Sequence, residues 1–129
     1  LVRRGGWTPG LRGPQHVAFR SNDIVASAEA LHAAGVPLID IPDNYYDDLA
    51  ARYDLPAGRL AELRRLRLLY DREESGELLH LYTEVIGSRV FFEVVQRIGG
   101  YDGYGAANAS IHIAAHHRQR HPDRPDRPV

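Results

Sequence analysis

The chain has 129 residues, of which 43% are hydrophobic and 26% are charged, and its formal net charge is −1. These values are typical of one small folded domain, and they give no sign of nucleic acid or an anionic membrane as partner. The absence of cysteine excludes disulfides and thiolate chemistry, so any metal must be held by histidine and carboxylate side chains. No apolar run approaches about 18 residues, and no signal peptide pattern opens the chain. We therefore expect a cytoplasmic protein without a membrane span.

The two ends of the chain differ in composition from its middle. Residues 1–12 are basic and rich in glycine, and we interpret them as a linker or the truncated end of a longer protein. Residues 13–118 carry the periodic patterns of one folded module. Residues 119–129 are charged and rich in proline, which is typical of a disordered tail.

The first half of the module predicts two strands and three helices. They cover residues 15–19 (strand), 21–35 (helix), 36–42 (strand) and 43–66 (two short helices broken at Pro56). Ser21 or Asn22 is expected to cap the first helix, because short polar side chains accept hydrogen bonds from the free N–H groups of a first turn. Gly35 is expected to end that helix.

The second half of the module predicts three strands and a helix. They cover residues 68–85 (a hairpin that turns at Ser75 and Gly76), 90–98 (strand), 99–110 (Gly-rich loop) and 110–120 (helix). Helices and strands that follow one another in this order indicate an α+β fold with a mainly antiparallel sheet.

Three ionisable side chains interrupt the apolar strands. Glu93 lies in "VFFEVVQRI", where an ionised carboxylate needs a partner: a metal, an arginine, or solvent at a sheet edge. His80 shares a strand face with Tyr82, and His16 opens the first strand. If these strands are neighbours, His16, His80 and Glu93 converge on one surface. Two histidines and one carboxylate form the metal site of non-haem Fe(II) oxygenases, whereas histidines on apolar strands are also often hydrogen-bonded without a metal.

We expect the remaining histidines to face solvent. His32 lies on the polar side of the first helix. The histidines near the end of the chain are interpreted as a solvated helix end rather than a metal site; they are His112, His116, His117 and His121.

Five stretches together resemble a known family. They are "GPQHVAF", "IPDNYYDDL", "LLYDREESGELLHLYT", "FFEVVQR" and "GYGAAN". In this order they resemble the C-terminal part of 4-hydroxyphenylpyruvate dioxygenase, a member of the vicinal-oxygen-chelate superfamily. The resemblance implies a βαβββ module with a helical insertion and a C-terminal helix, which forms half of a cupped sheet around one metal.

The resemblance also implies a site. The family holds Fe(II) with two histidines and one glutamate, and His16 and Glu93 match two of these ligands. The third would come from a preceding module, or from a second chain. The matched substrate-binding positions are Gln15, His80, Phe91, Tyr104 and Asn108. The implied reaction takes a small aromatic 2-oxo acid and O2, removes CO2 and hydroxylates the ring, a step in aromatic amino acid catabolism.

Two positions depart from the dioxygenase pattern. The dioxygenases typically have Gln where this chain has His80, and an aromatic residue where it has Ala109. The segments "DNYYDDLAARYDL" and "LLHLYTE" also resemble bacterial two-domain proteins, some of them 3-dehydroshikimate dehydratases, in which a barrel precedes a dioxygenase-like half. On this alternative the chain is the accessory C-terminal domain of such a dehydratase.

Overall fold

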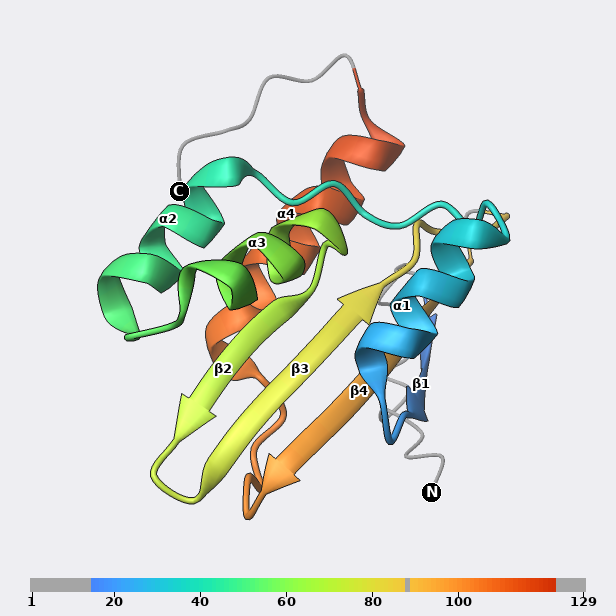
Figure 1. The fold of residues 1–129 in the computed structure, drawn as a ribbon. Helices are drawn as coiled ribbons and strands as arrows, with labels where there is room; N and C mark the ends of the chain where they lie inside the picture. Colours follow the sequence, from blue (N-terminus) through green and yellow to red (C-terminus); the bar gives the residue numbers. More distant parts are fainter. Residues whose placement is uncertain (1–14, 88, 123–129) are drawn as a thin grey trace.

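A computed structural model describes residues 15–87 and 89–122 (Figure 1). Four strands form one sheet, and four α-helices and one short 3-10 helix pack around it. In chain order the elements are β1 (Gln15–Arg20), α1 (Ile24–Ala33), α2 (Asp43–Arg52), α3 (Ala57–Arg65), β2 (Leu69–Glu73), β3 (Gly76–Tyr82), β4 (Val90–Gly99), η1 (Ala106–Asn108) and α4 (Ala109–Arg120).

The sheet has the strand order β1-β4-β3-β2. Strands β2, β3 and β4 are antiparallel neighbours, and β1 runs parallel to β4. A parallel pair cannot be joined by a tight turn, so the chain between β1 and β4 must cross over, and it does so through three helices and the β2–β3 hairpin. The predicted α+β fold with a mainly antiparallel sheet is confirmed.

The prediction of a strand over residues 36–42 is wrong. Only Leu38 forms an isolated bridge, with Thr83, and two flanking backbone bonds run from Ile39 N to Tyr82 O and from Glu84 N to Pro37 O. Pro37 has no N–H to donate, so the pairing cannot extend into a ladder. The apolar residues of this segment are buried because it crosses over the core, and a buried connection has the same composition as a strand.

The start of α1 also differs from the prediction. Asp23, not Ser21 or Asn22, is the N-cap, and its Oδ1 accepts a hydrogen bond of 3.1 Å from the backbone N of Ala26. The side chain of Gln96 in β4 accepts a second bond, of 2.9 Å, from the N of Ile24. This bond fixes the first turn of α1 to the sheet.

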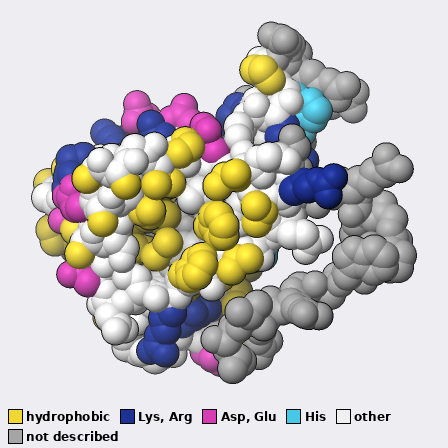
Figure 2. Space-filling view, turned by 90° about the vertical axis from the view of Figure 1, so that its right-hand side faces the viewer, with side chains coloured by type: hydrophobic (Ala, Val, Ile, Leu, Met, Phe, Trp, Pro, Cys, Tyr) yellow, Lys and Arg dark blue, Asp and Glu magenta, His cyan; other side chains and the backbone are white. Residues whose placement is uncertain are grey.

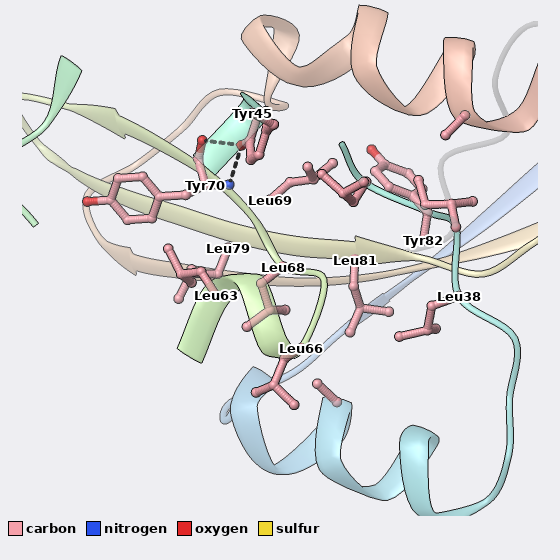
Figure 3. Close-up of a cluster of buried hydrophobic side chains, with 14 of the residues drawn as sticks. Leu38, Tyr45, Leu63, Leu66, Leu68, Leu69, Tyr70, Leu79, Leu81 and Tyr82 are labelled. Atoms are coloured by element: carbon pink, nitrogen blue, oxygen red, sulfur yellow. Dashed lines mark hydrogen bonds between the residues drawn. The ribbon is translucent and has the colours of Figure 1, made fainter. Parts of the chain in front are cut away.

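The two faces of the sheet are covered by different helices. In β3, Leu79 and Leu81 point to the side of α1 and α3, and Tyr82 points to the side of α4 (Figure 3). His80 is two residues before Tyr82 in the same strand, so its side chain lies on the α4 side as well. The leucine face forms the main core together with buried side chains of the helices, among them Leu63. The α4 face therefore carries the polar strand residues singled out in the sequence.

Helix α4 extends beyond the predicted end of the module at residue 118. Gln119 in its last turn accepts a bond of 2.8 Å from Val85 N and donates one of 3.1 Å to Val85 O, so it belongs to the packed structure. The predicted tail from residue 123 onward and the predicted linker at 1–12 lie outside the described residues. Among the described helices, none combines the length and the apolar character needed to cross a membrane.

Candidate metal centre

Strands β1 and β4 bring His16 and Glu93 together. Their register places His16 opposite Phe91, two residues before Glu93 on the same face of the sheet. His16 Nε2 lies 3.8 Å from Glu93 Oε2. The imidazole is stacked on the Phe91 ring, with a centroid distance of 5.3 Å and an interplanar angle of 13°. Because Phe91 is buried, this stack gives the partly exposed His16 ring a defined orientation.

The other oxygen of Glu93 is held from β3. His80 Nδ1 lies 3.1 Å and the Tyr82 hydroxyl 3.2 Å from Glu93 Oε1. Burial raises the pKa of the Glu93 carboxyl, but the contacts with His80 and Tyr82 lower it more, so that its pKa lies below the ordinary value of 4.5. Glu93 is therefore a carboxylate at neutral pH, with one oxygen hydrogen-bonded and the other directed to His16.

His80 lies behind Glu93, inside the protein. Its side chain is 0% exposed, and its Nε2 lies 2.9 Å from the side-chain amide of Asn108. Asn108, also buried, accepts a bond of 2.9 Å from the Tyr45 hydroxyl of α2. Both ring nitrogens of His80 thus have partners within the protein. In this arrangement His80 is not free to act as the third metal ligand, and its predicted contact with a substrate stays a prediction.

The described part of the chain offers two donors for a metal, not three. No three His, Cys, Asp or Glu side chains in it are placed to hold a metal ion together. His16 Nε2 and Glu93 Oε2 nevertheless form a mixed nitrogen and carboxylate pair of the kind that binds divalent iron. The residues present therefore fit part of a metal centre, one that needs at least one further ligand.

Two other predicted substrate-binding residues, Gln15 and Tyr104, have surroundings that the structure describes. Gln15 precedes His16 in β1, so strand alternation places its side chain on the opposite face of the sheet. Tyr104 is 67% exposed and lies against the guanidinium of Arg97, 5.5 Å from its ring centroid. Their roles in binding a substrate stay predictions, as do those of Phe91 and Asn108.

The prediction that the C-terminal histidines form a solvated helix end is wrong for two of them. His112 stacks on Tyr82, with a centroid distance of 4.4 Å and an interplanar angle of 17°. His116 is buried against Phe91, and its Nε2 lies 2.9 Å from the carbonyl of Thr83. The two residues are four apart on α4, and that spacing places both on the face that packs on the sheet. His117 and His121 are exposed, and so is His32, as predicted.

Burial of His112 predicts a pH dependence of stability. Burial and the neighbouring His116 lower the pKa of His112 from 6.5 to about 4. Between these values the unfolded chain binds a proton that the folded chain does not, so the free energy of unfolding decreases as the pH falls from 6.5 to 4. We expect His112→Leu to make this decrease shallower in urea titrations at several pH values. His32→Leu, at an exposed histidine, is the control and should leave the slope unchanged; an unchanged slope in His112→Leu would contradict the prediction.

Sequence reasoning missed two residues at this centre. The only signal for His112 was its spacing to His116, and the alternation of β3 marked Tyr82 as a neighbour of His80 without indicating its bond to Glu93. A shallow hollow on the opposite face, lined in part by Phe19, Leu31 and Val94, lies between β1 and α1 and contains none of the predicted site residues.

Comparison with solved structures identifies the class of fold to which the chain belongs. No family model matches the chain. Among solved structures it is similar to a fusion protein of a xylose isomerase-like TIM barrel and a 4-hydroxyphenylpyruvate dioxygenase, with 50% identity and a TM-score of 0.78 over 81% of this chain and 17% of that chain. It is also similar to a mutant of 4-hydroxymandelate synthase from Streptomyces coelicolor, with 33% identity and a TM-score of 0.69 over 84% of this chain and 30% of that one. The fold is that of a vicinal-oxygen-chelate module.

Two curated relatives show which vicinal-oxygen-chelate proteins the chain is similar to in sequence. The chain is 51% identical over 104 residues to the 3-dehydroshikimate dehydratase of Pseudomonas putida, covering 80% of this chain and 16% of the relative. It is 37% identical over 114 residues to a probable 4-hydroxyphenylpyruvate dioxygenase of Aspergillus fumigatus, covering 84% of this chain and 28% of the relative. The chain is thus a module like the C-terminal part of 4-hydroxyphenylpyruvate dioxygenase, and it spans less than a third of the length of either relative.

Proposed function

We propose that this chain supplies His16 and Glu93 as two of the three protein ligands of an Fe(II) centre in a dioxygenase of the 4-hydroxyphenylpyruvate dioxygenase family. The observation that carries the proposal is the opposed pair itself. His16 Nε2 faces Glu93 Oε2 at 3.8 Å, while the second carboxylate oxygen is held by His80 and Tyr82. A site of two histidines and one carboxylate leaves open positions on iron.

The third ligand would come from a preceding module or from a second chain. Strand β1 is at the edge of the sheet, and within residues 15–87 and 89–122 no strand pairs with its outer side. Figure 2, which views the molecule from the side of β1 and α1, shows hydrophobic side chains gathered on this face. Phe19 of β1 is 53% exposed. An unpaired strand edge beside apolar surface supports a neighbouring module next to β1.

The residues of this chain have defined tasks in such a reaction. Fe(II), when bound, supplies the chemistry that couples decarboxylation of an aromatic 2-oxo acid to hydroxylation of its ring with O2. Glu93 provides a negative charge that offsets part of the metal charge, and Phe91 orients the imidazole of His16. Helix α4 covers the inner side of the site with His112 and His116, which excludes water from the Tyr82 side.

The second candidate is an accessory domain of a 3-dehydroshikimate dehydratase. Its specific support is the 51% identity to the dehydratase of Pseudomonas putida, against 37% to the Aspergillus dioxygenase. Ala109 is consistent with this candidate, because the first residue of α4 then offers no ring to cover an aromatic substrate.

One experiment separates the two candidates. The full-length protein is loaded anaerobically with Fe(II), and oxygen uptake is recorded on adding 4-hydroxyphenylpyruvate. We expect uptake that is stoichiometric with CO2 release and is lost in Glu93→Gln. No uptake by the iron-loaded protein, together with dehydration of 3-dehydroshikimate that Glu93→Gln leaves unchanged, would reject the dioxygenase and support the accessory domain.

A further inference from the structure

A chain of buried hydrogen bonds leads from Glu93 to the edge of the sheet. Glu93 Oε1 contacts His80 Nδ1, His80 Nε2 contacts the Asn108 amide, and the other end of that amide contacts the Tyr45 hydroxyl. The Asn108 amide also lies 3.1 Å from the backbone carbonyl of Tyr70 in β2. In the part of the chain that the structure describes, β2 is the outermost strand on this side, and Tyr45 and Asn108 satisfy backbone groups of Tyr70 that no further strand pairs there.

The carbonyl of Tyr70 decides which way the Asn108 amide is turned. A carbonyl oxygen only accepts hydrogen bonds, so the Asn108 atom beside it must be the NH2 group. The amide oxygen then accepts from the Tyr45 hydroxyl at 2.9 Å. Turning the amide over would place two oxygens 3.1 Å apart in a buried site with no proton between them, which is a costly arrangement.

The orientation of Asn108 in turn places the proton of His80. The second hydrogen of the Asn108 NH2 group points to His80 Nε2 at 2.9 Å, so Nε2 must accept. A neutral imidazole that accepts at Nε2 carries its hydrogen on Nδ1, and that hydrogen is donated to Glu93 Oε1. The Tyr82 hydroxyl donates to the same oxygen at 3.2 Å. Oε1 thus receives two hydrogen bonds, and Oε2 receives none from these residues.

We propose that His80 is a positioning residue for Glu93: as the Nδ1–H tautomer set by Asn108 and the Tyr70 carbonyl, it holds Oε1 and leaves Oε2 directed to His16. The inference rests on the proposed function where it concerns a metal, but the direction of the hydrogen bonds does not depend on one. This positioning role also explains in physical terms how His80 can stand where the dioxygenases typically have a glutamine. A glutamine can also donate a hydrogen bond at one end of its side chain and accept one at the other. Histidine at this position therefore keeps the same order of donors and acceptors from Asn108 to Glu93.

The first test reads the tautomer and needs no metal. The full 129-residue chain is labelled with 15N-histidine, and long-range 1H–15N NMR spectra identify the protonated nitrogen of each ring, with the His80 signals assigned by their absence in His80→Gln. We expect hydrogen on Nδ1 and none on Nε2. Hydrogen on Nε2, alone or together with Nδ1, would overturn the inference, because Asn108 would then have to be turned over.

The second test measures how variants at His80 change the Co2+ affinity of the full-length protein. Cobalt is used here as a substitute for iron. We expect His80→Leu to lower the affinity by about 10- to 100-fold, as loss of a group that orients a ligand does. His80→Gln should stay within a few-fold of the unchanged protein, because its amide restores both hydrogen bonds. His32→Gln, on exposed α1 surface, is the matched control and should have no effect.

The outcomes distinguish this inference from the function on which it rests. Equal affinity in His80→Leu and the unchanged protein would overturn the positioning role, and so would an equal loss in His80→Leu and His80→Gln when both variants fold. If the unchanged protein binds no Co2+, the proposed metal centre fails, and the tautomer spectrum alone then decides whether His80 holds Glu93 as inferred.

Discussion

Replacing Glu93 with alanine is expected to remove the metal from the full-length protein while its fold persists. Glu93 is the carboxylate that faces His16, so the variant keeps a single ligand from this chain. We expect metal affinity to fall by more than about 100-fold, the upper end of what loss of an outer-shell partner costs. Anaerobic titration with Fe(II), followed by metal analysis of the desalted protein, measures the effect.

The fold should tolerate this change at a moderate cost. Removing the carboxylate leaves the Tyr82 hydroxyl hydrogen without an acceptor, and it leaves the Tyr82 oxygen, 3.2 Å away, as the remaining acceptor for His80 Nδ1. The lost acceptor costs about 1–3 kcal/mol. Glu62→Ala, at a partly exposed carboxylate on α3 that pairs with Arg59, is the matched control and should keep full metal content. Iron stoichiometry in Glu93→Ala equal to that of the control would show that Glu93 is not a ligand.

Replacing Gly105 with alanine is expected to lower the free energy of unfolding, because Gly105 packs directly against the buried side chain of His80. Gly105 has φ +69°, a left-handed conformation that costs other residues about 1–2 kcal/mol. A Cβ atom here would lie 2.9 Å from His80 Cε1 and 2.9 Å from Leu78 Cδ2. Both side chains are buried and packed, so the extra methyl group adds about 1–3 kcal/mol of overpacking. Urea denaturation of the variant and the unchanged chain measures the total.

Gly35 provides the matched control for this substitution. It has φ +71°, almost the same as Gly105, but a Cβ atom there would meet nothing within 4 Å. Gly35→Ala therefore carries the backbone strain without the contact with His80. If the two variants lose the same stability, the close approach of Gly105 to His80 is not a constraint on the site.

Local patterns predicted the part of the site that one strand or one pair of strands defines. The period of two placed His80 with Tyr82 on one face of β3 and Glu93 with Phe91 on one face of β4, and the structure brings both strands together with β1, which carries His16. The register of paired strands follows from burying one face of the sheet, so the faces predict this convergence once the strands are neighbours. That β1 pairs with β4 is shown by the structure and not by the pattern.

The remaining parts depend on contacts between distant segments. Residues 36–42 have the composition of a strand, but proline removes a donor that a ladder needs, and the neighbouring backbone allows a single bridge. The bond between Tyr45 and Asn108 joins residues 63 apart, and no spacing rule connects them. Likewise, His112 and His116 are polar by type, and only the docking of α4 on Phe91 and Tyr82 makes their side of the helix the buried one.

The most direct test of the metal centre is a crystal structure of the full-length protein grown with Co2+, with the metal located by its anomalous scattering. We predict a cobalt ion about 2.1 Å from both His16 Nε2 and Glu93 Oε2, the usual length of such bonds, with a third protein ligand from outside this chain. A structure with cobalt bound elsewhere in the protein, and with His16 and Glu93 joined only by a hydrogen bond, would contradict the account.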